Sequence, residues 1–155
     1  MNNLQGNFGN INYKAPEMLL NLPYNGIKAD VFSLGQILFN IVTGINGFNS
    51  ARHNDNYYRL IFQQDFEHYW QRIENTYHLN LSQNFKNLFI TMVSYDPAHR
   101  PTIFDDILNH PWFQEINVLN EGQRNTLENE VRNEFQIRQQ HIQPIQQVDD
   151  LNDDN

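Results

Sequence analysis

Residues 30–44 read Asp-Val-Phe-Ser-Leu-Gly-Gln-Ile-Leu-Phe-Asn-Ile-Val-Thr-Gly. The apolar side chains that recur at helical spacing in this stretch are Val31, Leu34, Leu38, Ile41 and Val42. Further apolar side chains fall on the other faces of the same helix, namely Phe32, Ile37 and Phe39. Because a helix that is apolar nearly all round must be covered by protein on nearly every side, the pattern predicts a central core helix. We expect Asp30 to cap its N-terminus and Gly44 to stop its C-terminus.

The composition excludes several classes of function. The 155 residues suffice for one modest domain, and a formal net charge of -8 argues against a nucleic-acid or anionic-membrane surface as the main purpose. There is no cysteine, and the histidines lack the paired spacing of zinc ligands, so no metal site is predicted. No secretory signal and no membrane-spanning stretch is visible, and we therefore expect a cytoplasmic or nuclear protein.

The rest of the chain also favours helices. Periodicity and end signals predict further helices at residues 15–20, 82–95 and 102–109, and residues 57–62 form an amphipathic stretch. The bulky aromatic side chains at residues 66–70 are expected to pack a surface loop onto the core. Because no stretch has the alternation typical of a strand, the predicted fold class is all-α.

The character of the sequence changes toward its C-terminus. The apolar residues that lie one helical turn apart among charged residues there are Leu127, Val131 and Phe135. They predict an exposed amphipathic helix over residues 124–141, and the acidic residues 148–155 are expected to be disordered. We therefore predict a helical domain over residues 1–116 and a Gln/Asn-rich tail over residues 117–155. The tail is interpreted as a helix that lies on the domain or on a partner.

Three motifs in a particular order carry a resemblance. Residues 9–17 read Gly-Asn-Ile-Asn-Tyr-Lys-Ala-Pro-Glu, and residues 30–35 read Asp-Val-Phe-Ser-Leu-Gly. Residues 96–101 read Asp-Pro-Ala-His-Arg-Pro, followed by His-Pro-Trp-Phe at residues 110–113. Together they resemble the end of the activation segment, the central helix and the closing arginine of the C-terminal lobe of a eukaryotic serine/threonine protein kinase. The resemblance covers about residues 8–113, so the domain over residues 1–116 would be a partial kinase domain.

The resemblance also implies roles for individual residues. Glu17 and Arg100 would form a buried ion pair, in which the planar guanidinium holds the carboxylate by two hydrogen bonds. Asp30 would anchor the lobe by accepting backbone N–H groups of the catalytic loop. The floor of the peptide-substrate pocket would include Gly9, Asn10 and Tyr13. Asn10 departs from the threonine that is usual in the family at this position.

The residues that perform phosphoryl transfer in this family have no counterpart in the printed sequence. The family uses a glycine-rich phosphate cover, a strand lysine, a catalytic-loop aspartate and a metal-binding Asp-Phe-Gly. Neither His-Arg-Asp nor Asp-Phe-Gly occurs in the 155 residues. We therefore assign no catalytic residue, no metal ligand and no cofactor to this chain, and expect it to be inactive alone. ATP and magnesium are implied only for a full kinase domain.

Two interpretations remain open. In the first, the chain is the substrate-side part of a serine/threonine kinase that transfers the γ-phosphate of ATP to protein substrates. Its partners would be a protein substrate or the missing portion of the kinase, with no nucleic acid or membrane. In the second, the chain is a catalytically inactive, kinase-like helical binding module. A coincidental match in an unrelated all-α interaction protein is a third alternative.

The first interpretation carries a structural expectation. In the family, helices and a loop that precede the activation segment cover part of the central helix. Without them, the helix at residues 30–44 should expose a contiguous apolar patch that is larger than soluble monomers usually show. We therefore expect marginal stability or dependence on a partner.

Overall fold

The structure is a computed structural model. It describes residues 4–6, 9–101 and 104–115, together with Gly122, Asn125, Thr126, Asn129, Arg132 and Asn133. The chain divides into two compact units, Met1–Ile116 and Asn117–Asn155, and the elements discussed below belong to the first. The residues that carry the predicted amphipathic tail helix, Leu127, Val131 and Phe135, lie outside the described residues, as does the predicted helix cap Thr102.

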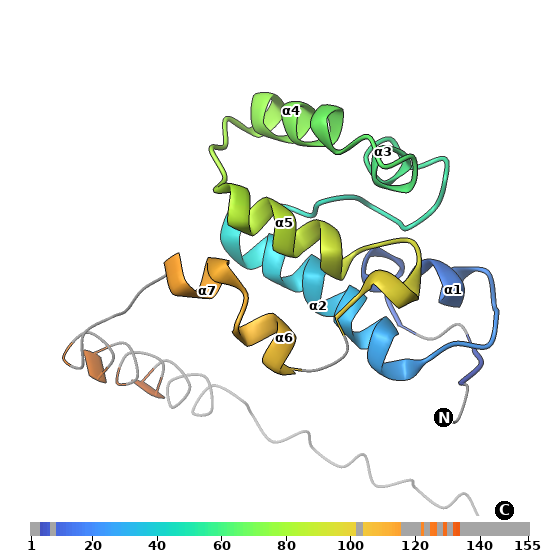
Figure 1. Ribbon diagram of the computed structural model, residues 1–155, viewed down its shortest axis with the longest axis horizontal. Coiled ribbons are helices and arrows are strands. Elements are labelled where there is room, and N and C mark those ends of the chain that lie inside the picture. Colours follow the sequence, from blue (N-terminus) through green and yellow to red (C-terminus); the bar gives the residue numbers. More distant parts are fainter. Residues whose placement is uncertain are drawn as a thin grey trace, which may run out of the picture. The chain divides into compact units, whose positions relative to one another are not determined.

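The described part of the first unit is built from helices (Figure 1). In chain order these are the 3-10 turn η1 (Ile11–Tyr13), the helices α1 (Pro16–Leu19), α2 (Gly26–Thr43), α3 (Tyr58–Phe62), α4 (Phe66–Tyr77) and α5 (Gln83–Met92), the 3-10 turn η2 (Pro97–His99), and the helices α6 (Phe104–Leu108) and α7 (Pro111–Glu115). The predicted all-α class is confirmed, since β pairing among the described residues is limited to one bridge between Leu4 and Tyr24. None of the helices described has the length and apolarity needed to cross a membrane.

The central helix α2 begins at Gly26, so the prediction that Asp30 caps it is wrong. The Asn25 side chain is the N-cap and accepts a hydrogen bond from the Lys28 backbone N–H at 3.3 Å. Asparagine caps a helix about as well as aspartate does, and the sequence Asn25-Gly26 resembles a turn, which hid the true start. The C-terminal prediction is confirmed, because Gly44 adopts a left-handed conformation with φ 77°.

Only one face of α2 is covered by the described residues. The buried side includes Val31, Phe32 and Phe39. The opposite side exposes a line of large apolar side chains, called here the α2 stripe: Ile27, Leu34, Ile37 and Ile41. The expectation that Leu34 and Ile41 are buried is therefore wrong, with Ile41 75% exposed. Large apolar side chains are thus exposed on this helix, as expected, and the expected size of a contiguous patch stays a prediction.

Residues 66–70 form the first turns of α4 and not the predicted surface loop. Tyr69 and Trp70 are neighbours in the sequence, and Ile73 follows them one helical turn later. The three buried side chains therefore lie on one face of the helix. Asp65 caps the helix by accepting the His68 N–H, and its carboxylate also bonds the His68 ring at 2.8 Å. This hydrogen bond raises the pKa of His68 and lowers that of Asp65.

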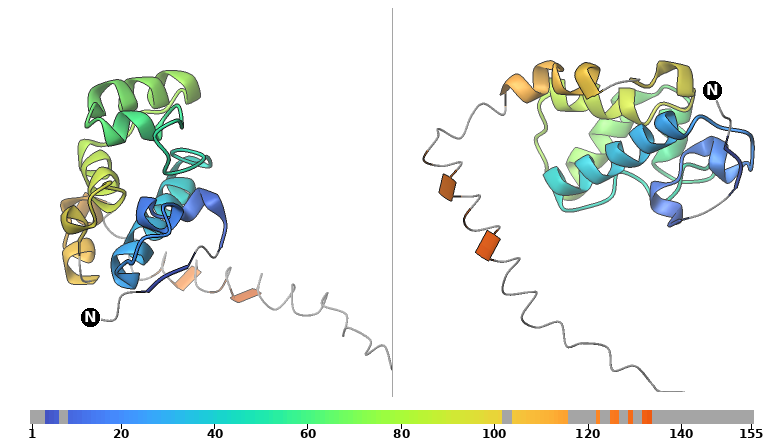
Figure 2. Two further views of the ribbon diagram at one scale, coloured as in Figure 1. Left: turned by 90° about the vertical axis from the view of Figure 1, so that its right-hand side faces the viewer. Right: turned by 90° about the horizontal axis from the view of Figure 1, so that it is seen from below.

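The core is an aromatic cluster between α2 and α5, which run side by side (Figures 1 and 2). The rings of Phe39 and Phe89 are 4.6 Å apart at their centroids, and those of Phe48 and Tyr58 are 4.7 Å apart. Gly35 permits the close approach of the two helices, because a Cβ atom there would lie 2.8 Å from a methyl group of Val93. The closely packed helices α2 and α5 therefore support the loops around them.

The loop between α2 and α3 is organised by a buried carboxylate. Asp55, only 9% exposed, accepts backbone N–H groups from both sides of the loop. Its Oδ2 atom accepts from Asn49 and Ser50 at 3.1 and 3.2 Å, and its Oδ1 atom accepts from Tyr57 and Tyr58 at 2.9 Å each. One side chain thus replaces the regular backbone hydrogen bonds that this loop lacks.

Replacing Asp55 with alanine should lower the free energy of unfolding by about 2–4 kcal/mol. The reason is that the buried Tyr58 N–H would lose its acceptor, while the more exposed donors can bond water, and a hydrogen bond to a charged group is worth about 1.5–3 kcal/mol. Urea unfolding followed by circular dichroism measures the loss. Asp106→Ala, at an exposed position of α6, is the matched control and should change stability by less than about 0.5 kcal/mol. Equal effects of the two substitutions would contradict this role for Asp55.

Candidate functional site

Arg100 lies at the centre of the first unit, directly after η2, and is 2% exposed. All five of its side-chain N–H donors have acceptors. Nε donates to the Ser94 carbonyl at 2.8 Å, and Nη2 donates to the Tyr95 carbonyl at 3.2 Å. Nη1 donates to the Lys28 carbonyl at 3.0 Å, and the two remaining donors point at Glu17. A buried guanidinium with every donor satisfied avoids most of the cost of leaving polar groups unpaired.

Glu17 on α1 supplies the charge that balances Arg100. Its carboxylate accepts two parallel hydrogen bonds, from Nη1 at 2.7 Å and from Nη2 at 2.9 Å. Both side chains are nearly inaccessible to solvent, at 0% for Arg100 and 10% for Glu17. The guanidinium also lies over the ring of Phe32, 5.0 Å from its centroid, a favourable cation–π position. This pair joins residues 83 positions apart in the sequence.

Lys28 closes the same network from α2. Its carbonyl accepts from Arg100, and its own Nζ donates to the backbone carbonyl of Arg100. Arg100 is therefore bonded to α1, to the start of α2 and to the segment that follows α5. These three parts of the chain meet at one residue, so the loss of Arg100 should loosen all of them together.

The η1 turn is mounted on α2 by two side chains of that helix. Ser33 Oγ donates to the Tyr13 carbonyl at 2.8 Å, and Gln36 Nε2 donates to the Asn12 carbonyl at 3.0 Å. The same Gln36 nitrogen group donates to the Phe48 carbonyl at 3.0 Å. Gln36 therefore links η1 with the loop that Asp55 organises.

The residues predicted to face a peptide substrate lie on this mounted turn. Gly9 and Asn10 are exposed, and Tyr13 is half-buried. Gly9 has φ +91°, a conformation that other residues rarely adopt, and a Cβ atom there would meet open space. The Asn10 side chain is engaged locally, since its Oδ1 atom accepts the Asn12 N–H at 3.0 Å and so caps η1.

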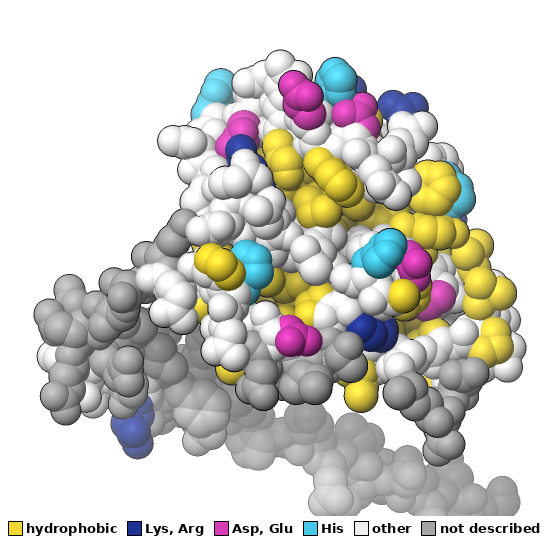
Figure 3. All heavy atoms as spheres, viewed as in Figure 1, with side chains coloured by type: hydrophobic (Ala, Val, Ile, Leu, Met, Phe, Trp, Pro, Cys, Tyr) yellow, Lys and Arg dark blue, Asp and Glu magenta, His cyan; other side chains and the backbone are white. Residues whose placement is uncertain are grey.

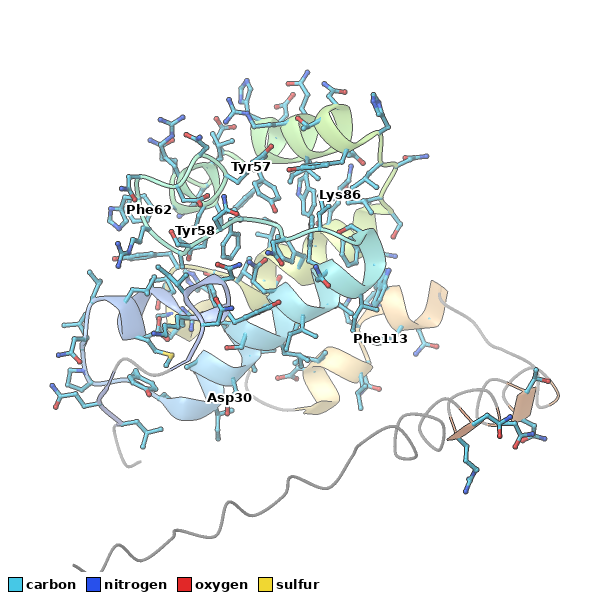
Figure 4. The ribbon with its side chains drawn as sticks, turned by 180° about the vertical axis from the view of Figure 1, so that it is seen from behind. Asp30, Tyr57, Tyr58, Phe62, Lys86 and Phe113 are labelled. Carbon is cyan, nitrogen blue, oxygen red and sulfur yellow. The ribbon has the colours of Figure 1, made fainter. Side chains whose placement is uncertain are left out.

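The structure brings some predicted site residues together and leaves one apart. Glu17 and Arg100 are in direct contact, and Gly9, Asn10 and Tyr13 lie together at and just before η1. Asp30 belongs to neither group, because it is exposed within α2, near the N-terminal end of the helix (Figure 4). Its predicted role as an anchor of backbone N–H groups stays a prediction.

Two structural residues of the site were missed in the sequence. Gln36 is fully buried on the covered face of α2, and Asp55 is nearly buried in a polar loop. Gln36 is one of several polar residues in the α2 sequence, which also include Ser33 and Asn40, so no local signal marks it as the buried one. Asp55 stands among exposed Asn and His residues, and no local pattern distinguishes it.

The geometry offers a backbone turn that side chains of α2 hold in place. Among the described residues, no group of three His, Asp or Glu side chains is arranged to hold a metal ion. Through their hydrogen bonds, Ser33 and Gln36 can fix the position and orientation of the backbone of η1. That is the task of a surface against which another polypeptide is positioned.

Replacing Arg100 with alanine should destabilise the protein by about 3–5 kcal/mol, because it leaves the Glu17 carboxylate buried without its partner. A double-mutant cycle with Glu17→Ala, measured by urea unfolding, should give a coupling energy of at least about 1 kcal/mol. The matched control is Lys86→Ala, which removes the less buried pair with Glu74 and should cost far less. Additive effects of the Arg100 and Glu17 substitutions would show that the two side chains do not act as a pair.

Comparison with known proteins gives a consistent result. A family model described as "Protein kinase domain" matches residues 1–113. Similar curated proteins include a probable serine/threonine-protein kinase MARK-A of Dictyostelium discoideum, 34% identical over 72% of this chain and 9% of that protein. A human SNF-related serine/threonine-protein kinase is 32% identical over 70% of this chain and 13% of its own length. A calcium and calcium/calmodulin-dependent serine/threonine-protein kinase of Pisum sativum is 35% identical over 69% of this chain and 19% of its own length.

The share of each protein that is matched determines what the similarity shows about this chain. The chain spans no more than about a fifth of the length of these relatives, so their complete activities are not carried over with the similarity. The family model, in contrast, covers most of the chain, including the Glu17–Arg100 pair and η1. The helical fold and these matches together show that the chain belongs to the serine/threonine protein kinase family, as part of the C-terminal lobe of a protein kinase domain.

Proposed function

We propose that this chain is the substrate-side lobe of a serine/threonine protein kinase, which positions a protein substrate for transfer of the γ-phosphate of ATP. The observation that carries the proposal is the mounting of the exposed turn at residues 9–13 on α2, through Ser33 and Gln36. Phosphoryl transfer depends largely on positioning, so a rigid surface for the acceptor is a direct contribution to catalysis.

The Glu17–Arg100 pair holds the other end of the same segment. Pro16 and Glu17 lie in α1, which follows η1 directly, and Arg100 ties α1 to the start of α2. The segment is thus fixed at η1 and at α1, while Gly9 and Asn10, which directly precede η1, stay exposed. This arrangement supports a role for Gly9, Asn10 and Tyr13 in contacting the substrate backbone.

The groups that would hold ATP and magnesium are proposed to come from polypeptide outside the printed sequence. The 155 residues contain neither His-Arg-Asp nor Asp-Phe-Gly, the motifs that supply the base and a metal ligand in this family. The α2 stripe supports the proposal, because it is a line of apolar side chains that protein must cover in a stable assembly. The partners on this interpretation are the remaining part of a kinase and a protein substrate.

A chimeric kinase tests the proposal. Residues 9–113 of this chain would replace the corresponding segment of the human SNF-related relative, and incorporation of the γ-phosphate into a serine/threonine peptide would be measured. We expect the chimera to be active, and Asn10→Thr to be at least as active, since it restores the residue usual in the family. A chimera that folds and binds ATP but does not transfer phosphate would overturn the proposed function.

The α2 stripe gives a second prediction. The full chain should bind a hydrophobic fluorescent dye, and Ile37→Lys combined with Ile41→Lys should lower that fluorescence several-fold without loss of stability, because both side chains are exposed. Dye fluorescence and urea unfolding on the same samples check this. Leu20→Lys, at another exposed apolar position, is the control and should leave most of the fluorescence. Unchanged fluorescence in the double variant would contradict an accessible stripe.

The alternative function, a catalytically inactive binding module, is favoured by one observation. The aromatic core around Phe39, Phe48 and Phe89 closes among the described residues without further polypeptide. The transcript upstream of the Met1 codon separates the two proposals. In-frame codons for His-Arg-Asp and Asp-Phe-Gly support the kinase, whereas an in-frame stop codon immediately upstream supports the stand-alone module.

A further inference from the structure

A groove runs between α4 and α5, apart from the turn at residues 9–13. It consists of two adjoining cavities with volumes of about 600 and 540 Å³. Three residues, Phe66, Ile90 and Thr91, line both cavities, so the two lie next to each other. Figure 3 shows hydrophobic side chains gathered across this part of the surface, below the acidic side chains of the upper helix.

The floor of the groove is apolar and partly open to solvent. Phe66 and Ile90 are half-buried at its centre, and Trp70 closes one end of the floor. Phe62 and Tyr95 line the other end, with their rings 4.7 Å apart and nearly perpendicular. Exposed aromatic and aliphatic surface in a concave site is the usual anchor region of a protein–protein interface.

The charged residues around the groove are mostly acidic. Glu67, Glu74 and Asp96 all line it. Lys86 is its one lysine, and its charge is balanced by Glu74 at 2.8 Å, while its Nζ lies 5.8 Å from the centroid of the Trp70 ring. Within the described part of the chain, Glu67 takes part in no salt bridge, so its charge is available to an occupant.

We infer that this groove binds a basic amphipathic helix of a partner protein, with apolar side chains on the Phe66–Ile90 floor and Lys or Arg side chains beside Glu67 and Asp96. The acidic side chains of the rim favour a cationic occupant and repel an anionic peptide or membrane. The inference does not depend on phosphoryl transfer.

The shape of the groove favours a helical occupant. Its walls are two helices, and α4 alone has 12 residues, which corresponds to a length of about 18 Å. Grooves between helices commonly accept a third amphipathic helix through anchors spaced three, four or seven residues apart. Polar side chains such as Thr91, which is exposed, complete the rim.

Binding of a model peptide to the full chain tests the inference. The probe is a fluorescent two-heptad peptide with Leu at the a and d positions, Lys elsewhere and one photo-crosslinking residue at its centre. Its counterpart carries Glu in place of every Lys. We expect saturable binding of the Lys peptide, crosslinks to α4 or α5, and at least tenfold weaker binding of the Glu peptide, a difference of about 1.4 kcal/mol.

Two variants locate the site, and one controls for the α2 stripe. Ile90→Asp should weaken binding of the Lys peptide about tenfold or more. Should this variant fail to fold, Glu67→Lys, at an exposed position, replaces it and should weaken binding several-fold. Ile41→Asp removes an apolar group of the stripe and should leave binding unchanged.

Several results would overturn the inference. These are the absence of saturable binding, equal affinity for the Lys and Glu peptides, crosslinks confined to α2, or loss of binding in Ile41→Asp with no change in the α4–α5 variants. Each of these results would show either that the groove between α4 and α5 is not the binding site or that charge does not select the occupant.

Discussion

The rest of this structure depends on one buried guanidinium. Arg100 satisfies its five donors with Glu17 and with the carbonyls of Lys28, Ser94 and Tyr95, and so joins three distant parts of the chain. A lysine has no planar fork, so it cannot reproduce this set of contacts. Burying a charge pair gives little net stability in general. Here the pair connects α1, the start of α2 and the segment after α5 through one side chain.

The central helix has two faces with different purposes. On the buried face, Phe32 and Phe39 pack into the aromatic core, and Ser33 and Gln36 direct hydrogen bonds to η1. On the other face lies the α2 stripe, whose apolar side chains have no cover among the described residues. One helix therefore holds η1 and also exposes apolar side chains among the described residues. The second property explains why a kinase lobe is not expected to be highly stable by itself.

Much of the fold was predictable because its signals are local. Three of these signals extend over no more than one or two helical turns. They are the helical periodicity after Asp30, the serine that caps α5 and the glycine at position 44 that ends α2 in a left-handed conformation. The start of α2 was mispredicted because Asn25-Gly26 is compatible with both a turn and a helix cap. Residues 66–70 were mispredicted because five residues are too few to show helical period, and the buried Ile73 that completes the pattern lies further along.

The candidate site was only partly predictable. Glu17 and Arg100 were assigned from motif resemblance, since no local rule pairs residues so far apart. The roles of Gln36 and Asp55 depend on loops that approach them only in the folded chain, so local sequence patterns could not reveal them. The exposure of Leu34 and Ile41 likewise depends on which polypeptide covers α2, a property of the whole assembly and not of the helix sequence.

The most direct test of the central role of Arg100 is the hydrogen exchange of its Nε–H group in the full chain, measured by NMR on arginine-labelled protein. The resonance is assigned with Arg100→Lys. We predict slow exchange and a shift caused by the Phe32 ring, because the donor is buried and bonded to the Ser94 carbonyl. Exchange as rapid as that of the exposed Arg52 and Arg59 would contradict the account.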